Sequence, residues 1–530
     1  MEEAEPRSIT RRDWLLLAAL FALVLPLRLW LLSNTEVTAR DSIGYIRYAL
    51  QFEQVDAANQ RVSYQTVLKN NHQHPGYPLL VLAMSQPVRA WNGGLTAENM
   101  ELSTQLVNLI ASLLLILPMY FLARQFFDCT VSFGGTLLYQ YLPISAQNLS
   151  DGISEPVYLV MLVSGLLQLV HAVRERSVWR AMLCGLFTGL AYLTRPEGAL
   201  ILPTFGVVLI ALQLRASWRC PWRQCLECVA AGAVTAALVG APYYISTGNF
   251  SNKPTVNVIK QMADAPRATA SPILFAATVA RPGQEHGSAG MLARSAWALG
   301  VEMNQGFHYV AGVFAVLGFV WSFSRLRRDP GFWALLLYAL LHTIILLRLG
   351  MLANYISDRH VMILVLGGTY FAVAGMRELP LRLLALAPSR ANFAPFAFGV
   401  VFIALIAFCL PKALQRLHGN RLPNHEAGLW LADQFQDGDH IDDDHAWSHF
   451  FAGGIFRESQ RPPVLPMEYV PTTWTVLTRS RDTEIAKHQT EASVPGRAVK
   501  WWPESSDLQN ARVVVYSQPR DWDKNRWNKK

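Results

Sequence analysis

The chain has 530 residues, of which 52% are hydrophobic and only 16% are charged. A soluble domain carries about 25% charged residues, so this composition excludes an ordinary soluble globular protein and indicates a chain partly surrounded by lipid. The formal net charge is +8. Its basic residues lie in short loops between apolar runs rather than on one basic surface, so we expect a lipid bilayer and no nucleic acid as partner.

Eleven apolar runs are predicted to cross the bilayer as helices, which takes about 20 residues each. The first run is not expected to be a cleavable signal, because it is too long and no small-residue cleavage site follows it. A further apolar segment, 77–91, contains Pro87 and Arg89 and is predicted to lie at the interface or to re-enter the membrane. The predicted spans are 14–32, 102–123, 131–147, 156–173, 179–194, 198–214, 226–246, 306–323, 332–350, 360–376 and 394–411.

Arginines mark one side of this arrangement. With eleven spans, the loops that carry the arginines named at the end of this paragraph all fall on the same side, which the positive-inside rule assigns to the cytosol. The N-terminus is then cytosolic, and the other loops and the tail face the exoplasmic side, which is a periplasm or an organelle lumen. The arginines used are Arg11, Arg12, Arg124, Arg174, Arg176, Arg180, Arg215, Arg219, Arg223, Arg325, Arg327, Arg328, Arg377, Arg382 and Arg390.

The tail differs in character from the rest of the chain. It is polar and rich in Asp, and it contains the strand-like "RVVVYS" and the helix-like "HEAGLWLADQF". We therefore predict two domains, a polytopic transmembrane domain over 1–411 and a small exoplasmic α/β domain over 412–530. The expected fold is an all-α polytopic membrane protein of about 11 transmembrane helices with this small C-terminal domain.

Charged or ionisable side chains gather at the ends of spans on the predicted exoplasmic face. One such residue is usually a solvated helix cap, but four separate turns carry them here, which indicates a shared site. The residues are Asp41 and His74 in the loop 33–76, Asp151 and Glu155 in the turn 148–155, Arg195 and Glu197 in the turn 195–197, and Arg359 and His360 where the loop 351–359 meets the next span.

This combination of side chains suits a substrate that is part lipid and part polar. Arginines bind phosphate through paired hydrogen bonds, and a carboxylate can take a proton from an acceptor hydroxyl. Together they predict sugar transfer from a lipid-linked phosphate, whose departure as an anion needs positive charge. Asp151, Glu197 and His360 are further candidates for binding the substrate.

Four segments resemble the GT-C superfamily of polytopic membrane glycosyltransferases. They are "DSIGYIRYA", "HPGYPLL", "SEPVYL" and "LTRPEGALIL", in this order along the chain. The sequence is most similar to the branch that contains dolichyl-phosphate-mannose protein mannosyltransferases and bacterial aminoarabinose transferases, over roughly residues 14–375. The resemblance implies a GT-C-like fold and a glycosyltransferase, moving a hexose or a pentose.

The resemblance also implies a role for each matching residue. Asp41, in the first exoplasmic loop, would be the general base. Glu155 would orient the acceptor or help to bind a metal. Arg195 and Arg359 would hold the phosphate of the donor, and His74 would line the same pocket.

A divalent metal ion is left open as a cofactor. Many members of the family carry a second acid near the first, where this chain has Ser42 and Gly44, which weakens the case for a metal at Asp41. Asp151 could supply a missing ligand. The Asp- and His-rich segment 437–450 could also bind an ion, but a solvated turn is the favoured interpretation, because a metal site needs defined geometry as well as composition.

The predicted reaction is a single inverting displacement from a polyprenyl-phosphate-linked sugar onto a lipid, glycan or protein hydroxyl on the exoplasmic face. The alternative is a transporter or flippase for a lipid-linked or polar solute. Transporters place charges at the membrane midplane and show internal repeats, and here the nearest such charges, His342 and Arg348, can belong to a span end. A scaffold protein would leave the four polar turns unexplained.

Overall fold

The computed structural model describes residues 9–57, 63–214, 221–253, 288–353, 355–384, 393–436, 438–457, 470–479 and 496–519. The chain divides into two compact units. The first unit comprises 1–32, 52–80 and 107–415, and the second comprises 33–51, 81–106 and 416–530. Two segments from the N-terminal part of the chain therefore group with the tail, and the boundary between 411 and 412 stays a prediction.

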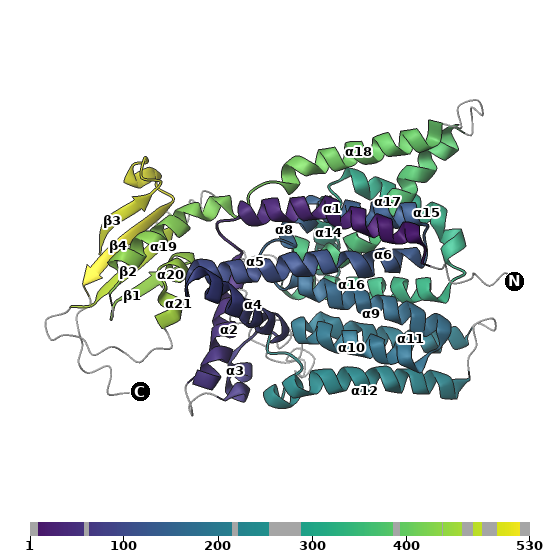
Figure 1. Ribbon diagram of the computed structural model, residues 1–530, viewed down its shortest axis with the longest axis horizontal. Coiled ribbons are helices and arrows are strands. Elements are labelled where there is room, and N and C mark those ends of the chain that lie inside the picture. Colours follow the sequence, from purple (N-terminus) through teal and green to yellow (C-terminus); the bar gives the residue numbers. More distant parts are fainter. Residues whose placement is uncertain are drawn as a thin grey trace. The chain divides into compact units, whose positions relative to one another are not determined.

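The first unit is built from helices. Figure 1 shows α9, α10 and α12 side by side. Helices α2, α4 and α5 run from one unit into the other along the chain. The helices are α1 (Arg11–Ser33), α2 (Arg40–Ala57), α3 (Tyr64–Asn70), α4 (Gly76–Asn92), α5 (Ala97–Leu114), α6 (Ile116–Arg124), α7 (Cys129–Tyr141), α8 (Pro143–Asn148), α9 (Glu155–Glu175), α10 (Val178–Thr194), α11 (Ile201–Gln213), α12 (Trp222–Thr247), α14 (Ser288–Gly306), α15 (Val310–Leu326), α16 (Pro330–Ala353), α17 (Asp358–Leu384) and α18 (Ala394–Ala413).

Among the described residues, eight helical stretches are long and apolar enough to cross a membrane. A ninth is obtained if α14 and α15, which meet at a bend of 101°, count as one span. The predicted span 179–194 falls on α10, an apolar helix just short of this length, and 131–147 is divided between α7 and α8. The interfacial segment 77–91 falls on α4. A polytopic, mainly helical protein is thus confirmed.

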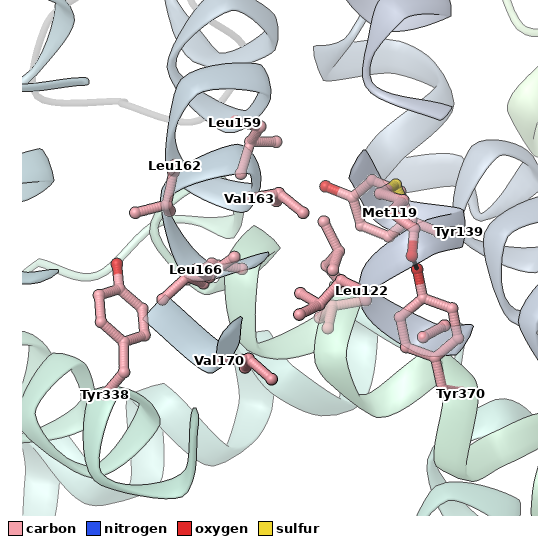
Figure 2. Packing of buried hydrophobic residues seen from close by; sticks show 14 of the residues in the cluster. Met119, Leu122, Tyr139, Leu159, Leu162, Val163, Leu166, Val170, Tyr338 and Tyr370 are labelled. Carbon is pink, nitrogen blue, oxygen red and sulfur yellow. Dashed lines mark hydrogen bonds between the residues drawn. The ribbon is translucent and has the colours of Figure 1, made fainter. Parts of the chain in front are cut away.

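The core of the first unit forms around α9. Figure 2 shows Leu159, Leu162, Val163 and Leu166 of this helix among side chains of neighbouring helices, including Met119 of α6. In lipid, helices associate through close packing rather than through exclusion of water, so small residues matter at their contacts. A side chain at Gly185 of α10, for example, would meet the backbone of α12.

Ion pairs join helices at the end of the first unit that was predicted to be cytosolic. Arg124 on α6 binds Asp13 on α1 with an N–O distance of 2.7 Å. Arg174 at the end of α9 pairs with Asp329, which immediately precedes α16. Arg215, Arg219 and Arg390, used above to predict orientation, lie outside the described residues.

The second unit contains a four-stranded sheet in the order β1-β2-β4-β3. Strand β1 (His440–Asp443) pairs parallel to β2 (Thr472–Thr478), whereas β4 (Val513–Pro519) pairs antiparallel to both β2 and β3 (Arg497–Trp502). Helix α19 (Leu422–Gln434) packs against the sheet, as Figure 1 shows, and buries Ala427 and Leu431 with Val476 and Val515. The small C-terminal α/β domain is therefore confirmed as a fold.

The Asp-rich segment of the tail forms hydrogen bonds at turns. Asp439 accepts from the backbone N–H of Thr472 at 2.7 Å and from the indole of Trp474 at 3.0 Å. Asp443 accepts from the backbone N–H groups of His445 and His449, each at 3.0 Å. These carboxylates fix the loops around β1, in agreement with the turn interpretation of this segment; Asp437 lies outside the described residues.

Candidate functional site

Glu155 occupies the first position of α9 and is buried, with 4% of its surface exposed. Pro156 follows it at the second position, where a missing N–H costs the helix nothing. The positive end of the helix dipole favours a carboxylate here. The sequence "SEPVYL" therefore places a negative charge in the interior at the start of a long helix.

Arg195 lies where α10 ends. Proline disfavours a helical residue before it, and Arg195 is extended, with φ −150° and ψ 139°, directly before Pro196. The chain then turns back tightly against α10. Gly198 permits this close approach, since a Cβ at this position would be 2.5 Å from the carbonyl carbon of Ala191. The "LTRPEG" segment thus turns the guanidinium and the carboxylate of Glu197 toward the same region.

These residues form one charged cluster in the first unit. The guanidinium of Arg195 donates a short hydrogen bond to Oε1 of Glu155. Nη1 of Arg359, at the start of α17, lies 3.9 Å from the same oxygen. Nε of Arg195 lies 3.6 Å from Oε2 of Glu197. Two cations therefore surround one buried carboxylate. The cluster brings together three of the four turns that the sequence predicted to share a site.

A recess opens beside this cluster. One part of its wall is charged or polar, and the other is formed by apolar side chains of α9, α16 and α17. Such a recess suits a ligand with an anionic group attached to a hydrocarbon chain. It is lined by Glu155, Tyr158, Leu159, Arg195, Glu197, His342, Ile345, Leu346, Leu349, Arg359, His360, Met362 and Ile363.

His360 and His342 contribute imidazoles to the recess. Nδ1 of His360 accepts a hydrogen bond from the backbone N–H of Ser357 at 3.1 Å, so the neutral ring carries its proton on Nε2. His342 reaches from α16 to the backbone carbonyl of His360 through Nε2, at 3.1 Å. His342 was interpreted above as a span-end residue, but it is buried inside α16. An ionisable residue within an apolar run was the signal that could have identified it.

The turn before Glu155 is fixed from two sides. Arg28 of α1 is buried and donates to the carbonyl of Ala146 at 2.7 Å and to Oγ of Ser150 at 3.0 Å. Asn148 donates to Oδ2 of Asp358 at 3.1 Å, next to Arg359. Asp151 is buried in this turn but does not line the recess.

His74 lies in an aromatic box in the same unit and is not among the recess-lining residues. Its ring centroid is 5.1 Å from that of Tyr192 and 4.7 Å from that of Tyr243, and Nε2 is 3.0 Å from Oγ of Ser251. Burial disfavours the charged imidazole and lowers the pKa of His74 to about 3, with a smaller contribution from Lys253. His74 is therefore neutral at physiological pH.

Acid should destabilise the protein through His74. An unfolded chain binds a proton at this residue below about pH 6.5, whereas the folded chain does so only near pH 3. Folded-state stability contributed by neutral His74 is thus present above pH 6.5 and is lost as pH falls below it, by up to about 1.4 kcal/mol per pH unit. We expect His74→Phe to show a smaller drop in thermal unfolding midpoint between pH 7 and pH 5 in detergent than wild type. The exposed His72 provides the control, since His72→Gln should keep the wild-type slope; equal slopes for all three proteins would contradict the prediction.

Asp41 belongs to the second unit, where it lies in the first turn of α2 and is partly buried. The backbone N–H of Thr38 donates to Oε1 of Glu101 at 2.5 Å, and Oγ1 of Thr38 lies 2.5 Å from Oγ of Ser42. The backbone on the N-terminal side of Asp41 is thus held by α5. Glu101 was not singled out from the sequence.

No group of three or more His, Cys, Asp or Glu side chains is arranged to hold a metal ion in the part of the chain that the structure describes. Asp41 and Asp151, considered above as ligands, belong to different units. A divalent ion therefore stays a prediction, and we derive no step of the reaction through it.

Comparison with family models matches residues 94–242 to the dolichyl-phosphate-mannose-protein mannosyltransferase family. The matched segment contains Glu155, Arg195 and Glu197 but neither Asp41 nor Arg359. No curated protein matches the chain at a significant level.

Solved structures of two membrane proteins are similar to this chain. ArnT from Cupriavidus metallidurans, bound to undecaprenyl phosphate, matches with a TM-score of 0.53 and 15% identity, over 96% of this chain and 98% of that one. The apo oligosaccharyltransferase of Archaeoglobus fulgidus matches with a TM-score of 0.50 and 14% identity, over 84% of this chain. The match spans less than two thirds of that enzyme, 64% of its length. Another structure of the archaeal protein contains an inhibitory peptide and a dolichol-phosphate.

The ArnT match runs almost from end to end in both chains, and the family match includes two of the turns that form the charged cluster. The resemblance seen in the sequence is thereby confirmed: this chain is a multi-pass membrane protein with the GT-C fold of membrane glycosyltransferases.

Proposed function

We propose that the protein transfers a sugar from a polyprenyl-phosphate donor to a hydroxyl acceptor at the exoplasmic face of a membrane, with inversion at the anomeric carbon. The observation that carries the proposal is the pair of arginines, Arg195 and Arg359, around Glu155 at the charged wall of a recess whose other wall is apolar. The sugar can be a hexose or a pentose, and the acceptor a lipid, a glycan or a protein.

The arginines would bind the phosphate of the donor. A guanidinium presents several N–H donors in one plane, which matches phosphate oxygens, and it keeps its charge at all physiological pH values. Glu155 holds Arg195 in place and leaves the cluster close to neutral before the donor binds. As the phosphate leaves, Arg195 and Arg359 would stabilise its growing negative charge. His360 and Glu197 would bind polar groups of the substrate beside it.

The chemical step needs one base and no covalent intermediate. In the proposal, Asp41 takes the proton of the acceptor hydroxyl, whose oxygen forms a bond to the anomeric carbon of the sugar. The bond from that carbon to the phosphate oxygen breaks, and its electron pair leaves with the polyprenyl phosphate. The inverted sugar, the lipid phosphate and a protonated Asp41 account for all atoms and charges.

Ligands of the similar structures support a lipid-phosphate donor. The ArnT structure contains undecaprenyl phosphate, and the archaeal oligosaccharyltransferase structure contains dolichol-phosphate. Both are polyprenyl chains that end in phosphate, which is the chemistry expected of the recess. In keeping with the positive-inside pattern, we place the N-terminus in the cytosol and residues 412–530 in the periplasm or lumen.

A transfer assay in proteoliposomes tests the proposal. Undecaprenyl-phosphate and dolichyl-phosphate sugars carrying radiolabelled mannose, glucose, galactose or aminoarabinose would be supplied with lipid, glycan and peptide acceptors. We expect one donor to yield labelled acceptor together with an equal amount of free lipid phosphate.

A transporter would give a different result in the same vesicles. Movement of the labelled donor across the bilayer without release of lipid phosphate would contradict the transferase and support the flippase alternative.

Dialysis against EDTA before the assay tests the predicted option of a divalent ion, because added Mg²⁺ or Mn²⁺ would restore transfer only in a metal-dependent enzyme.

A further inference from the structure

The tail of the chain reaches the segment that carries Asp41. The indole N–H of Trp447, in α20 (Trp447–Phe451), donates to the backbone carbonyl of Thr38 at 3.1 Å. Trp447 and Thr38 are both buried, with 6% and 2% of their surfaces exposed, and both belong to the second unit. A buried hydrogen bond therefore connects the tail to the chain just before α2.

Trp447 is itself firmly placed. The guanidinium carbon of Arg421 lies 4.9 Å from the centroid of its ring, a cation–π contact. Ser448, the next residue, donates to the carbonyl of Asn424 at 2.9 Å, and Asn424 donates to Oγ1 of Thr478 at 2.8 Å. Thr478 is on β2. The indole is thus connected to the sheet through hydrogen bonds between side chains and backbone.

Thr38 is held on both of its backbone polar groups. Its N–H is bound by Glu101 of α5 and its C=O by Trp447 of the tail. Thr38 lies three residues before Asp41, directly before the first turn of α2. A second contact between tail and segment is the ion pair of Arg416 with Glu36, which is exposed and therefore weak, at 3.7 Å.

We infer that Trp447 is a positioning residue for the reaction, and that the tail serves to fix the start of α2 so that Asp41 keeps one orientation. This inference rests on the proposed role of Asp41 as the base. A carboxylate that must accept a proton within hydrogen-bond reach loses rate when its backbone moves by about 1 Å. The contact therefore gives the tail a function in the chemical step without contact to substrate.

Hydrogen–deuterium exchange and kinetics of Trp447→Phe test the inference. Phenylalanine keeps an aromatic ring beside Arg421 but has no N–H for Thr38. In nanodiscs we expect amides of residues 36–44 to exchange at least tenfold faster than in wild type. With an undecaprenyl-phosphate sugar as donor, we expect kcat to fall roughly tenfold and the KM for donor to stay unchanged.

Trp430→Phe is the matched control. Trp430 packs edge-on against Trp474 and Trp502 in the tail's own core. The Trp430→Phe variant should keep the amide exchange of residues 36–44 and the kcat near wild-type values. Unchanged amide exchange in β4 would show that the tail is folded in both variants. If Trp447→Phe fails to accumulate, Arg421→Met, which removes the cation over the indole, should give the same changes to a smaller extent.

Two results would overturn the inference. One is slow exchange at 36–44 in Trp447→Phe, and the other is faster exchange with an unchanged kcat. Failure of the proposed base is a separate outcome, because it would appear as full activity in Asp41→Asn whatever the exchange of Trp447→Phe.

Discussion

Replacement of Asp41 by asparagine is expected to abolish sugar transfer while the protein inserts and accumulates normally. Asparagine has nearly the same size and can still accept a hydrogen bond, but it cannot take a proton from an acceptor hydroxyl. General-base catalysis is typically worth about 10²–10⁴ in rate, so kcat should fall by that factor. The measurement is initial-rate transfer in proteoliposomes at saturating donor, with protein amount normalised by quantitative blotting.

Two control variants separate the loss of the proposed base at Asp41 from the loss of a negative charge on α2. Asp41→Glu retains a carboxylate on a longer side chain, and it should recover part of the rate that asparagine loses. Glu53→Gln removes an acid further along the same helix and should transfer sugar at the wild-type rate. Full activity of Asp41→Asn would remove the proposed base, and inactivity of Glu53→Gln would show that any neutralisation of α2 is harmful.

Much of the transmembrane architecture could be predicted from hydropathy, because a bilayer forces spans of defined length. Two breaks between helices have local causes, one within the predicted span 131–147 and one at the beginning of the predicted span 306–323. Pro143 begins α8, and Leu142 before it leaves helical geometry, with ψ 132°. At the other break, His308 and Tyr309 have positive φ between α14 and α15. The proline was a readable signal, whereas nothing in "GFHYVAG" indicates a left-handed residue.

All four polar turns could be recognised from the sequence, because each carries a proline beside its charged or ionisable residue or a charged residue at a helix start; three of them meet in the first unit. Glu155, Arg195 and Arg359 do meet in the first unit. His74 shows the limit of such reasoning. Its neighbours Tyr192 and Tyr243 are far away in sequence, so their packing around the imidazole could not be foreseen.

The connection of the tail to the Asp41 segment was equally hidden. Trp447 and Thr38 are 409 positions apart, and an indole in a polar tail is most often part of the tail's own core. Only the folded structure shows that the indole N–H of this tryptophan donates to the backbone of another segment. Residues that act through the backbone of a distant element leave no local pattern of charge or hydropathy.

Replacement of Arg195 by glutamine should produce the second large effect. Removing one preorganised donor to a developing anion typically costs about 10²–10³ in kcat, and we expect a loss of that size together with a higher KM for the donor. The kcat of Arg195→Lys should lie between that of wild type and that of Arg195→Gln, since lysine keeps the charge but lacks the planar guanidinium that matches phosphate. Arg174→Gln breaks the ion pair with Asp329 far along α9 from Glu155 and should retain wild-type transfer.

The effect on catalysis must be separated from an effect on folding, because Arg195 compensates a buried charge. Removing one partner of a buried ion pair costs about 3–5 kcal/mol, since the other charge stays behind without its counter-ion. The double variant Glu155→Gln/Arg195→Gln removes both charges and should recover most of the thermal stability that Arg195→Gln loses. Its transfer rate should nevertheless remain low, because no guanidinium is left at this position to hold the departing phosphate. Recovery of transfer along with stability would show that Arg195 acts only by neutralising Glu155, and the phosphate would then have to be bound elsewhere in the recess.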